Sequence, residues 1–208
     1  MIKVSKIVSL GPNCHTAGIL KRLNYKTESY PFDWIISDTD IVIDCINTNF
    51  EKYLNKEYYF DNSKAYKQPI VGHTLYKDNM FVHRNPLNNN DDYSYILRCV
   101  ERFKKLYENK DIVFVYTVYD DYDINKFIKL KEVLDTKINS CYLLILHYVK
   151  TTEDKKNKFK LGNPFSNIYS ISNNISYNKN KQYDIDQSIK NFYKNHNPVS
   201  EIFLYKKC

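Results

Sequence analysis

The chain has 208 residues, 43% of them hydrophobic, and this length fits a single domain over residues 1–208. No stretch approaches the roughly 18 consecutive apolar residues of a membrane span, and the start lacks a secretory pattern, so we expect a cytoplasmic protein without a membrane partner. The net charge of +7 comes mostly from scattered Lys, a poorer nucleic-acid footprint than clustered Arg, so nucleic-acid binding, which the charge and the abundant Tyr leave open, is only a third and weaker option. The excess of Lys, Asn, Ile and Tyr indicates an AT-rich genome, which for a giant virus would mean host cytoplasm or virion.

The chain begins with a strand–turn–helix pattern. Residues 4–10 form an apolar strand, residues 11–13 (Gly-Pro-Asn) form a turn, and helical spacing of apolar residues follows. Cys14 lies where the turn becomes the helix. The N–H groups and partial positive charge of a helix start favour an anion, so a thiol there loses its proton more easily, and the thiolate is the nucleophilic form.

The next hundred residues alternate between loops and helices. Residues 26–38 predict a loop or short strand, because Pro31 favours extended geometry before it. Residues 38–54 and 93–109 carry apolar side chains at intervals of three and four, which predicts two amphipathic helices. The irregular stretch of about 55–92 between them is expected to be an insertion that contains a small hairpin (strands 70–76 and 79–84).

The clearest pattern follows these helices. Residues 111–118 and 141–149 are continuous apolar runs, typical of strands buried on both faces, and residues 124–134 between them have helical spacing. A strand, a helix and a second strand form a βαβ unit with parallel pairing. Together with the first strand, this unit predicts an α/β fold: a three-layer sandwich with a mainly parallel sheet, Rossmann-like or flavodoxin-like.

The last quarter of the chain gives weaker signals. Residues 151–164 are charged and predict a loop, residues 167–173 alternate like an edge strand, and residues 184–193 could form a final helix.

Five cysteines are present: Cys14, Cys45, Cys99, Cys141 and Cys208. Their odd number and wide spacing argue against a disulfide framework and against a zinc pair, so we expect no metal and no cofactor. Three of them lie in apolar patterns and are expected to be buried, whereas the terminal one is expected to be an exposed thiol.

A nucleophilic cysteine needs a base, and the chain offers five histidines. His73 and His83 lie on the predicted hairpin, and either could be that base. His147 ends a buried strand and could face the same crevice, or it could be a core residue. His15 adjoins the cysteine but points about 100° away from it on the helix. His196 lies in a polar tail.

Asp33 is the best candidate to orient the imidazole, although a turn-capping role is equally open. A retained alternative is a helix start that binds an anion through Gly11 and Asn13, with Arg22 or Arg84 contacting a phosphate or carboxylate. A Cys-based phosphatase loop is excluded, because the position that needs Arg holds Leu. Walker A, Gly-x-Gly-x-x-Gly and His-Glu-x-x-His patterns are absent from the sequence.

Several segments together resemble a family found in bacteria and giant viruses that is labelled "putative papain-like cysteine peptidase", a domain of unknown function. The matching segments are Ser9-Leu-Gly-Pro-Asn-Cys-His-Thr-Ala17, Leu20-Lys-Arg22, Ser29-Tyr-Pro-Phe-Asp-Trp-Ile35, Val82-His83, Arg98 to Phe103 and the strand at Ile112. The resemblance implies that Cys14 is the nucleophile, His83 the base and Asp33 the third member of a catalytic group.

The resemblance also implies a cysteine on a helix packed against an antiparallel sheet, whereas the apolar runs predict a parallel one. The predicted geometry is closer to esterases whose nucleophile follows the first strand, although their Asp-x-x-His near the chain end is absent here. We therefore expect a thiol-dependent hydrolase or acyl transferase acting on a small-molecule, glycan or peptide substrate. The alternative is a non-catalytic or nucleotide-sugar- or phosphate-binding α/β module.

Overall fold

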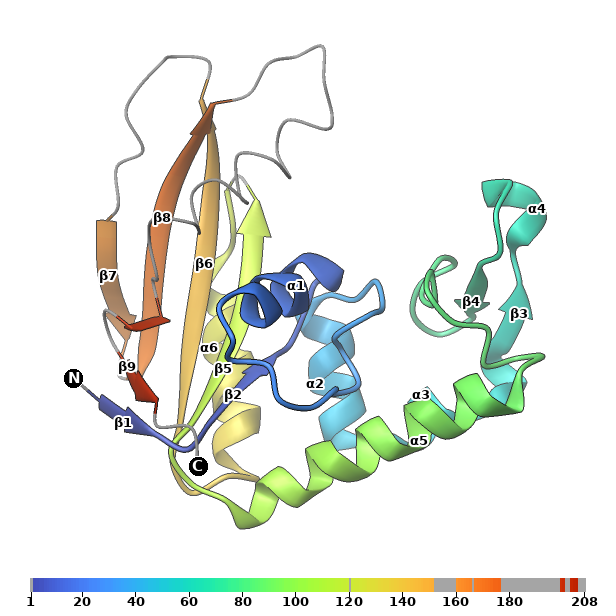
Figure 1. Ribbon diagram of the computed structural model, residues 1–208, viewed down its shortest axis with the longest axis horizontal. Helices are drawn as coiled ribbons and strands as arrows, with labels where there is room; N and C mark the ends of the chain where they lie inside the picture. Colours follow the sequence, from blue (N-terminus) through green and yellow to red (C-terminus); the bar gives the residue numbers. More distant parts are fainter. Residues whose placement is uncertain are drawn as a thin grey trace.

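A computed structural model describes residues 2–119, 121–151, 160–165, 167–176, 199–200 and 203–205. Its centre is a five-stranded sheet (Figure 1). In spatial order the strands are β2 (Lys6–Ser9), β5 (Ile112–Tyr119), β6 (Cys141–Thr151), β8 (Ile168–Ser176) and β7 (Lys160–Phe165). The first four are parallel and β7 is antiparallel to β8, which confirms a mainly parallel α/β fold.

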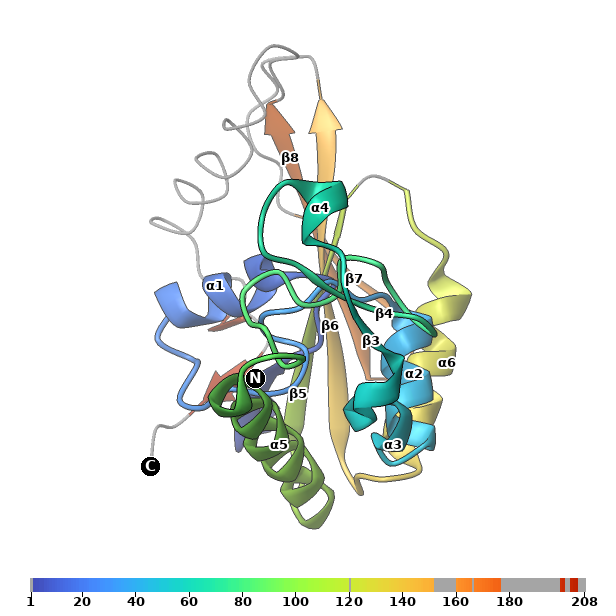
Figure 2. The same ribbon diagram turned by 90° about the vertical axis from the view of Figure 1, so that its right-hand side faces the viewer.

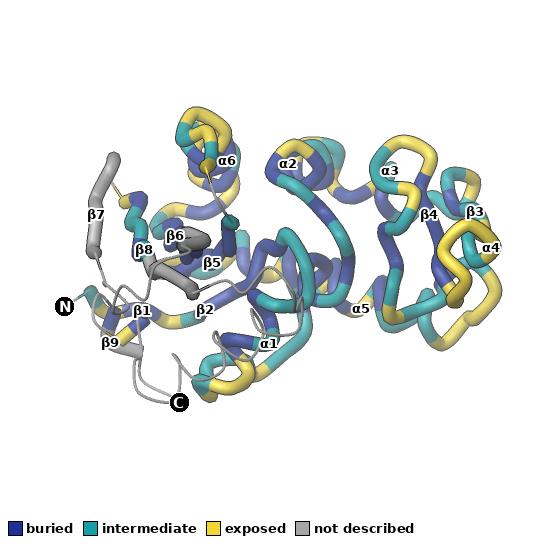
Figure 3. Tube along the Cα trace, turned by 90° about the horizontal axis from the view of Figure 1, so that it is seen from above, coloured by how far each residue is buried: buried dark blue, intermediate teal, exposed yellow. Residues whose placement is uncertain are grey.

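Helices cover both faces of the sheet. Helix α1 (Cys14–Arg22) packs on the face that carries Val113 and Val115 of β5. The alternating residues Phe114 and Tyr116 face the other side, where α2 (Thr39–Asn47), α5 (Asn90–Lys105) and α6 (Ile124–Asp135) contribute to the core. Figure 3 shows α1 on one side of the strands and α2 and α6 on the other, and Figure 2 shows α2 and α6 side by side. None of the described helices is long and apolar enough to cross a bilayer.

The order of the strands tests the prediction of a Rossmann-like or flavodoxin-like sheet. From β2 the described parallel strands follow one another in chain order. Rossmann-like and flavodoxin-like sheets instead reverse direction beside an early strand. The α/β sandwich is therefore supported, whereas the finer Rossmann-like or flavodoxin-like prediction is not confirmed.

Pairings near the end of the chain differ from those predicted. Residues 167–173 were expected at an edge, but β8 is paired on both sides, and β7 begins inside the predicted loop 151–164. Strand β7 could not be predicted because it contains Gly162 and Pro164. Both residue types usually mark turns, and within sheets Pro is mostly confined to edge strands. A short pair joins β1 (Ile2–Val4) in parallel to β9 (Phe203–Tyr205). The predicted helix 184–193 lies outside the described residues.

The hairpin predicted over residues 70–84, between helices α2 and α5, is confirmed only as a single antiparallel bridge, because its first strand pairs mainly with another segment. Strand β4 (Val71–His73) pairs with β3 (Tyr59–Asp61), and a single bridge, Val71 to Phe81, joins it to the segment 79–84. A three-residue partner is too short to leave an alternating pattern in the sequence. Figure 1 shows this part at the end of α5 away from the sheet. It also contains α3 (Glu51–Leu54), η1 (Lys56–Tyr58) and α4 (Ser63–Tyr66), and η2 (Leu106–Glu108) follows α5.

The helix predicted over residues 38–54 is two helices. Asp38 caps α2 by accepting the Ile41 N–H at 2.9 Å. The helix ends before Asn49 and Phe50, which both have positive φ (51° and 65°), and α3 then starts at Glu51. Apolar periodicity continues across the break because both helices pack on the same core, so the sequence pattern did not reveal it.

Candidate active site

Cys14 is the first residue of α1 and follows the carboxyl end of β2. Asn13 is the N-cap, with an extended backbone, and its side chain accepts the His15 N–H at 3.0 Å. Cys14 is half-buried, whereas Cys45, Cys99 and Cys141 are buried. The carboxyl edge of parallel strands is where ligands bind in α/β sheets, so Cys14 lies at the expected place for chemistry.

The turn before Cys14 is fixed from two sides. The Gly11 carbonyl accepts the Thr16 hydroxyl at 2.5 Å and the Thr117 N–H at 3.2 Å, which ties the turn to α1 and to β5. On the other side, the Ser37 N–H donates to the Pro12 carbonyl at 2.8 Å. Gly11 has a φ of +104°, and a Cβ there would lie 2.6 Å from the Ser37 hydroxyl oxygen. This position therefore requires glycine both for its backbone and for its packing.

Substitution of Gly11 by alanine is expected to lower the free energy of unfolding by at least about 1–3 kcal/mol, because the left-handed backbone and the contact with Ser37 both become unfavourable. Gly18→Ala is the matched control. A Cβ at Gly18 would meet only the Arg22 guanidinium, at 3.7 Å, so a gain of about 0.5–1 kcal/mol is expected from helix propensity. Urea denaturation measures both, and equal effects of the two substitutions would contradict this account.

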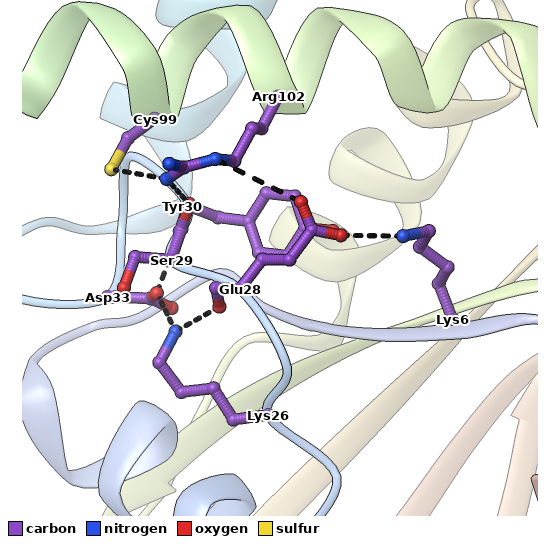
Figure 4. Close-up of polar contacts among 8 residues, drawn as sticks. All are labelled: Lys6, Lys26, Glu28, Ser29, Tyr30, Asp33, Cys99 and Arg102. Atoms are coloured by element: carbon purple, nitrogen blue, oxygen red, sulfur yellow. Dashed lines mark hydrogen bonds and ion pairs between the residues drawn. The ribbon is translucent and has the colours of Figure 1, made fainter. Parts of the chain in front are cut away.

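Asp33 lies in the loop that holds the turn, and only 1% of it is exposed. Its Oδ2 accepts the Tyr30 N–H at 2.8 Å and forms an ion pair with the Lys26 ammonium, itself only 10% exposed (Figure 4). Its Oδ1 is buried with no hydrogen-bond partner in the described structure. Burial raises the pKa of Asp33 by more than the nearby Lys26 charge and the Tyr30 N–H lower it.

The structure does not place Asp33 against an imidazole. In the described residues its carboxylate is hydrogen-bonded to Lys26 and Tyr30, and no hydrogen bond joins it to His83. The prediction that Asp33 orients the base directly is therefore not met, because burial makes the carboxylate depend on a nearby cation. Its neighbour in the chain, Trp34, packs edge-on against the exposed His83 ring, with 6.1 Å between ring centroids.

The segment 34–37 therefore supports both candidate catalytic residues. Ser37 binds the turn that leads into Cys14. One residue earlier, the Ile36 N–H donates to the Met80 carbonyl at 2.9 Å, which fixes the chain just before His83. A change in the 34–37 segment would move both groups.

The other described thiols are not suited to nucleophilic attack. Burial raises the pKa of Cys45 and of Cys141 to about 12, and it also raises the pKa of Cys99. These thiols stay protonated at neutral pH and have little access to solvent, in agreement with the prediction that they are small core residues. Cys208 lies outside the described residues.

His73 has a structural role. It is 1% exposed, its Nε2–H donates to the Lys52 carbonyl at 3.0 Å, and its Nδ1 accepts the Leu75 N–H at 3.3 Å. Its ring stacks on Tyr76 with 4.3 Å between centroids. Both nitrogens are occupied, so of the two histidines predicted as bases only His83 is open to solvent.

His73 also predicts a dependence of stability on pH. Burial lowers the pKa of His73 below 6.5, so the folded state keeps it neutral where the unfolded chain binds a proton. Stability is then fully present above pH 6.5 and falls on acidification, by at most about 1.4 kcal/mol per pH unit. Urea midpoints at pH 7.5 and pH 5.5 should differ in the wild type and differ less in His73→Phe. An equal difference in both proteins would contradict this role.

Two other described histidines, His15 on α1 and His147 on β6, bond to hydroxyl groups. His15 Nδ1 is 2.8 Å from the Tyr119 hydroxyl, and His147 Nδ1 is 3.2 Å from the Ser172 hydroxyl. His15 is thus bound to the end of β5. His147 is half-buried on β6, and His196 lies outside the described residues.

The four residues predicted to bind an anion do not form one site. Gly11 and Asn13 precede α1, whereas Arg22 is its last residue, about 12 Å further along the axis at 1.5 Å per residue. Arg84 donates to Asp92 at 2.7 Å and lies over the Tyr95 ring at 3.6 Å. Arg22 therefore lies at the far end of α1 from the turn, and Arg84 is paired with Asp92. In the described part of the chain, no three His, Cys, Asp or Glu side chains are grouped as metal ligands would be.

Residues 5–148 match the model of a family described as "Putative papain-like cysteine peptidase". The match covers more than half of the 208 residues and includes Cys14, Asp33 and His83. The chain belongs to this family. No curated protein and no solved structure matches it at the level of similarity that indicates relatedness. In this chain Cys14 follows the edge strand β2 of a parallel sheet, and it does not pack against an antiparallel sheet as the resemblance implied.

Proposed function

We propose that the chain is a thiol-dependent hydrolase or acyl transferase in which Cys14 is the nucleophile. The observation that carries the proposal is the placement of a half-buried thiol on the first residue of α1, at the carboxyl edge of a parallel sheet, while the other described thiols are buried. The family description names cysteine peptidases, and this position supports the same nucleophile for other acyl substrates.

In the proposed reaction His83 takes the thiol proton and Cys14 Sγ attacks the acyl carbon of an ester, amide or thioester. The carbon–leaving-group bond breaks, and the His83 imidazolium returns the proton to the leaving group. Water or an acceptor hydroxyl or amine then cleaves the Cys14 thioester and regenerates the thiol. The positive end of the α1 dipole would stabilise the oxyanion, while the His15 N–H already donates to Asn13.

The role of Asp33 in this proposal differs from the one predicted from the sequence, which was to orient the imidazole directly. Its pairing with Lys26 supports a positioning role, in which Asp33 holds the loop and Trp34 in turn packs on His83. It therefore acts through the loop and not by a hydrogen bond to the imidazole.

Alkylation with iodoacetamide at pH 7 tests the proposal. Peptide mass spectrometry follows each cysteine separately, with free glutathione in the same solution as the reference thiol. Cys14 is expected to react about tenfold or more faster than glutathione, because the helix start favours the thiolate, while Cys45, Cys99 and Cys141 react only on unfolding. A Cys14 rate no greater than that of glutathione would count against the enzyme and favour the non-catalytic binding module.

A further inference from the structure

The solvent-facing side of α1 connects Cys14 to a second region of the molecule. Thr16, Ala17, Ile19 and Leu20 are the buried residues of this helix. Cys14, Gly18 and Lys21 are spaced i, i+4 and i+7, so they lie within a narrow arc on the opposite side. At 1.5 Å per residue, Lys21 is about 10 Å from Cys14 along the axis.

Gly18 places no side chain of its own on the surface between these two residues. A glycine inside a helix is less favourable than alanine by about 1 kcal/mol, so its presence needs a reason. Close packing is not that reason, because an added Cβ would meet only the end of the Arg22 side chain at 3.7 Å. Around Gly18, midway from Cys14 to Lys21, the helix surface is therefore crossed only by the end of the exposed Arg22 side chain.

A pocket of about 580 Å³ lies at the Lys21 end of this strip. That volume is within the usual range of small-molecule sites. Three cations line it, Lys21, Lys26 and Arg102, against one carboxylate, Glu28. Figure 4 shows Glu28 already engaged by Lys6 at 2.7 Å and by Arg102 at 3.9 Å, so its charge is partly balanced from outside the pocket. Lys26 is in turn paired with the buried Asp33, so the excess of positive charge on the wall comes from Lys21 and Arg102.

The pocket also has aromatic walls, Trp34 and Tyr95. Trp34 lies below the Lys26 ammonium, 5.9 Å from ring centroid to Nζ, and it also contacts His83. Cations beside aromatic rings suit a ligand that joins an anionic group to a ring. Because Trp34 touches both the pocket and His83, a ligand on its ring is next to the proposed base.

We propose that this pocket binds the phosphate and ring of a phosphorylated small molecule. We also propose that the acyl end of the same molecule reaches Cys14 along the α1 surface at Gly18. The second half rests on the proposed function. A phosphate is favoured over a carboxylate because Lys21 and Arg102 can share its several oxygens, whereas Lys26 is already paired with Asp33.

Trp34 is the only tryptophan, so its fluorescence reports on the pocket directly. AMP, adenosine, benzoate and inorganic phosphate are titrated into the Cys14→Ala variant, which removes any dependence on the thiol. AMP is expected to quench Trp34 saturably and to bind about tenfold more tightly than adenosine or benzoate. Lys21→Ala is expected to remove this advantage, while Lys129→Ala, an exposed lysine on α6, leaves it unchanged. Equal affinity for AMP and adenosine, or no effect of Lys21→Ala, would overturn the phosphate site.

The path to Cys14 is tested with N-bromoacetyl-O-phosphoethanolamine, whose carbon–bromine bond breaks as the Cys14 sulfur–carbon bond forms and bromide leaves. Its neutral analogue without phosphate is the control reagent. The phosphorylated reagent is expected to alkylate Cys14 about tenfold faster than the neutral one, and Gly18→Leu is expected to abolish the difference while AMP still quenches Trp34.

If AMP binds but both reagents alkylate Cys14 at equal rates, the proposed path from the pocket to Cys14 is wrong, whereas the proposed phosphate site is kept. If Cys14 is also no faster than glutathione with iodoacetamide, the proposed function itself fails. A Gly18→Leu protein that keeps both AMP binding and the tenfold difference would likewise overturn the path.

Discussion

Lys26→Met is expected to lower the free energy of unfolding by about 3–5 kcal/mol, the largest effect on stability expected of any single exposed or half-buried polar side chain here. The reason is that Asp33 would keep a buried charge with the Tyr30 N–H alone, while its Oδ1 already has no partner in the described structure. Urea denaturation followed by Trp34 fluorescence measures the loss.

Lys52→Met is the matched control, since Lys52 pairs with Asp44 at 2.9 Å where both side chains are more than a third exposed. A surface pair of this kind contributes about 0–1 kcal/mol. The double variant Lys26→Met/Asp33→Asn should recover most of the loss, because it removes the buried charge. Similar losses in Lys26→Met and Lys52→Met would contradict a buried, structurally important pair.

The same variant predicts a dependence on pH. The folded pKa of Asp33 is raised above its unfolded value of 3.8 by burial, and removal of Lys26 raises it further. For a raised carboxyl pKa, the folded state binds the proton more tightly, so relative stability is greatest at low pH and falls as pH rises through the folded pKa. The deficit of Lys26→Met against wild type should therefore be smaller at pH 4 than at pH 7.

Loss of the proposed base is the second large effect. His83→Gln is expected to slow acyl transfer from p-nitrophenyl acetate to the protein by about 10²–10⁴-fold at pH 7, because no neighbouring group would take the thiol proton. Release of p-nitrophenolate measures the rate. His15→Gln is the competing variant, since His15 adjoins Cys14 but is bound to Tyr119. A large loss in His15→Gln with little change in His83→Gln would move the base to His15.

Much of the central fold could be predicted from the sequence, because long elements leave strong local patterns. The apolar runs of β5 and β6 predicted buried parallel strands, and the structure pairs Ile112 to Cys141 through Tyr119 to Tyr148. The turn before α1 could be predicted equally well, since glycine, proline and a capping Asn together specify where the helix starts.

Features that depend on distant residues could not be predicted in this way. Nothing local to Asp33 shows that Lys26 will neutralise it, because the pairing needs the loop to fold back on itself. The same is true of β3, whose three residues gain their partner only when β4 is brought beside them. The pocket draws residues from α1, the following loop and α5, so no single stretch of sequence carries its signature.

The most direct test of a nucleophilic Cys14 is the intact mass of the protein after brief reaction with p-nitrophenyl acetate, with the modified peptide then identified. The wild-type chain should gain one acetyl group on Cys14 that hydroxylamine removes as a thioester, and Cys14→Ser should fold normally and lack this adduct. An adduct spread over lysines, or one that forms equally in Cys14→Ser, would contradict the assignment of Cys14 as the reacting group.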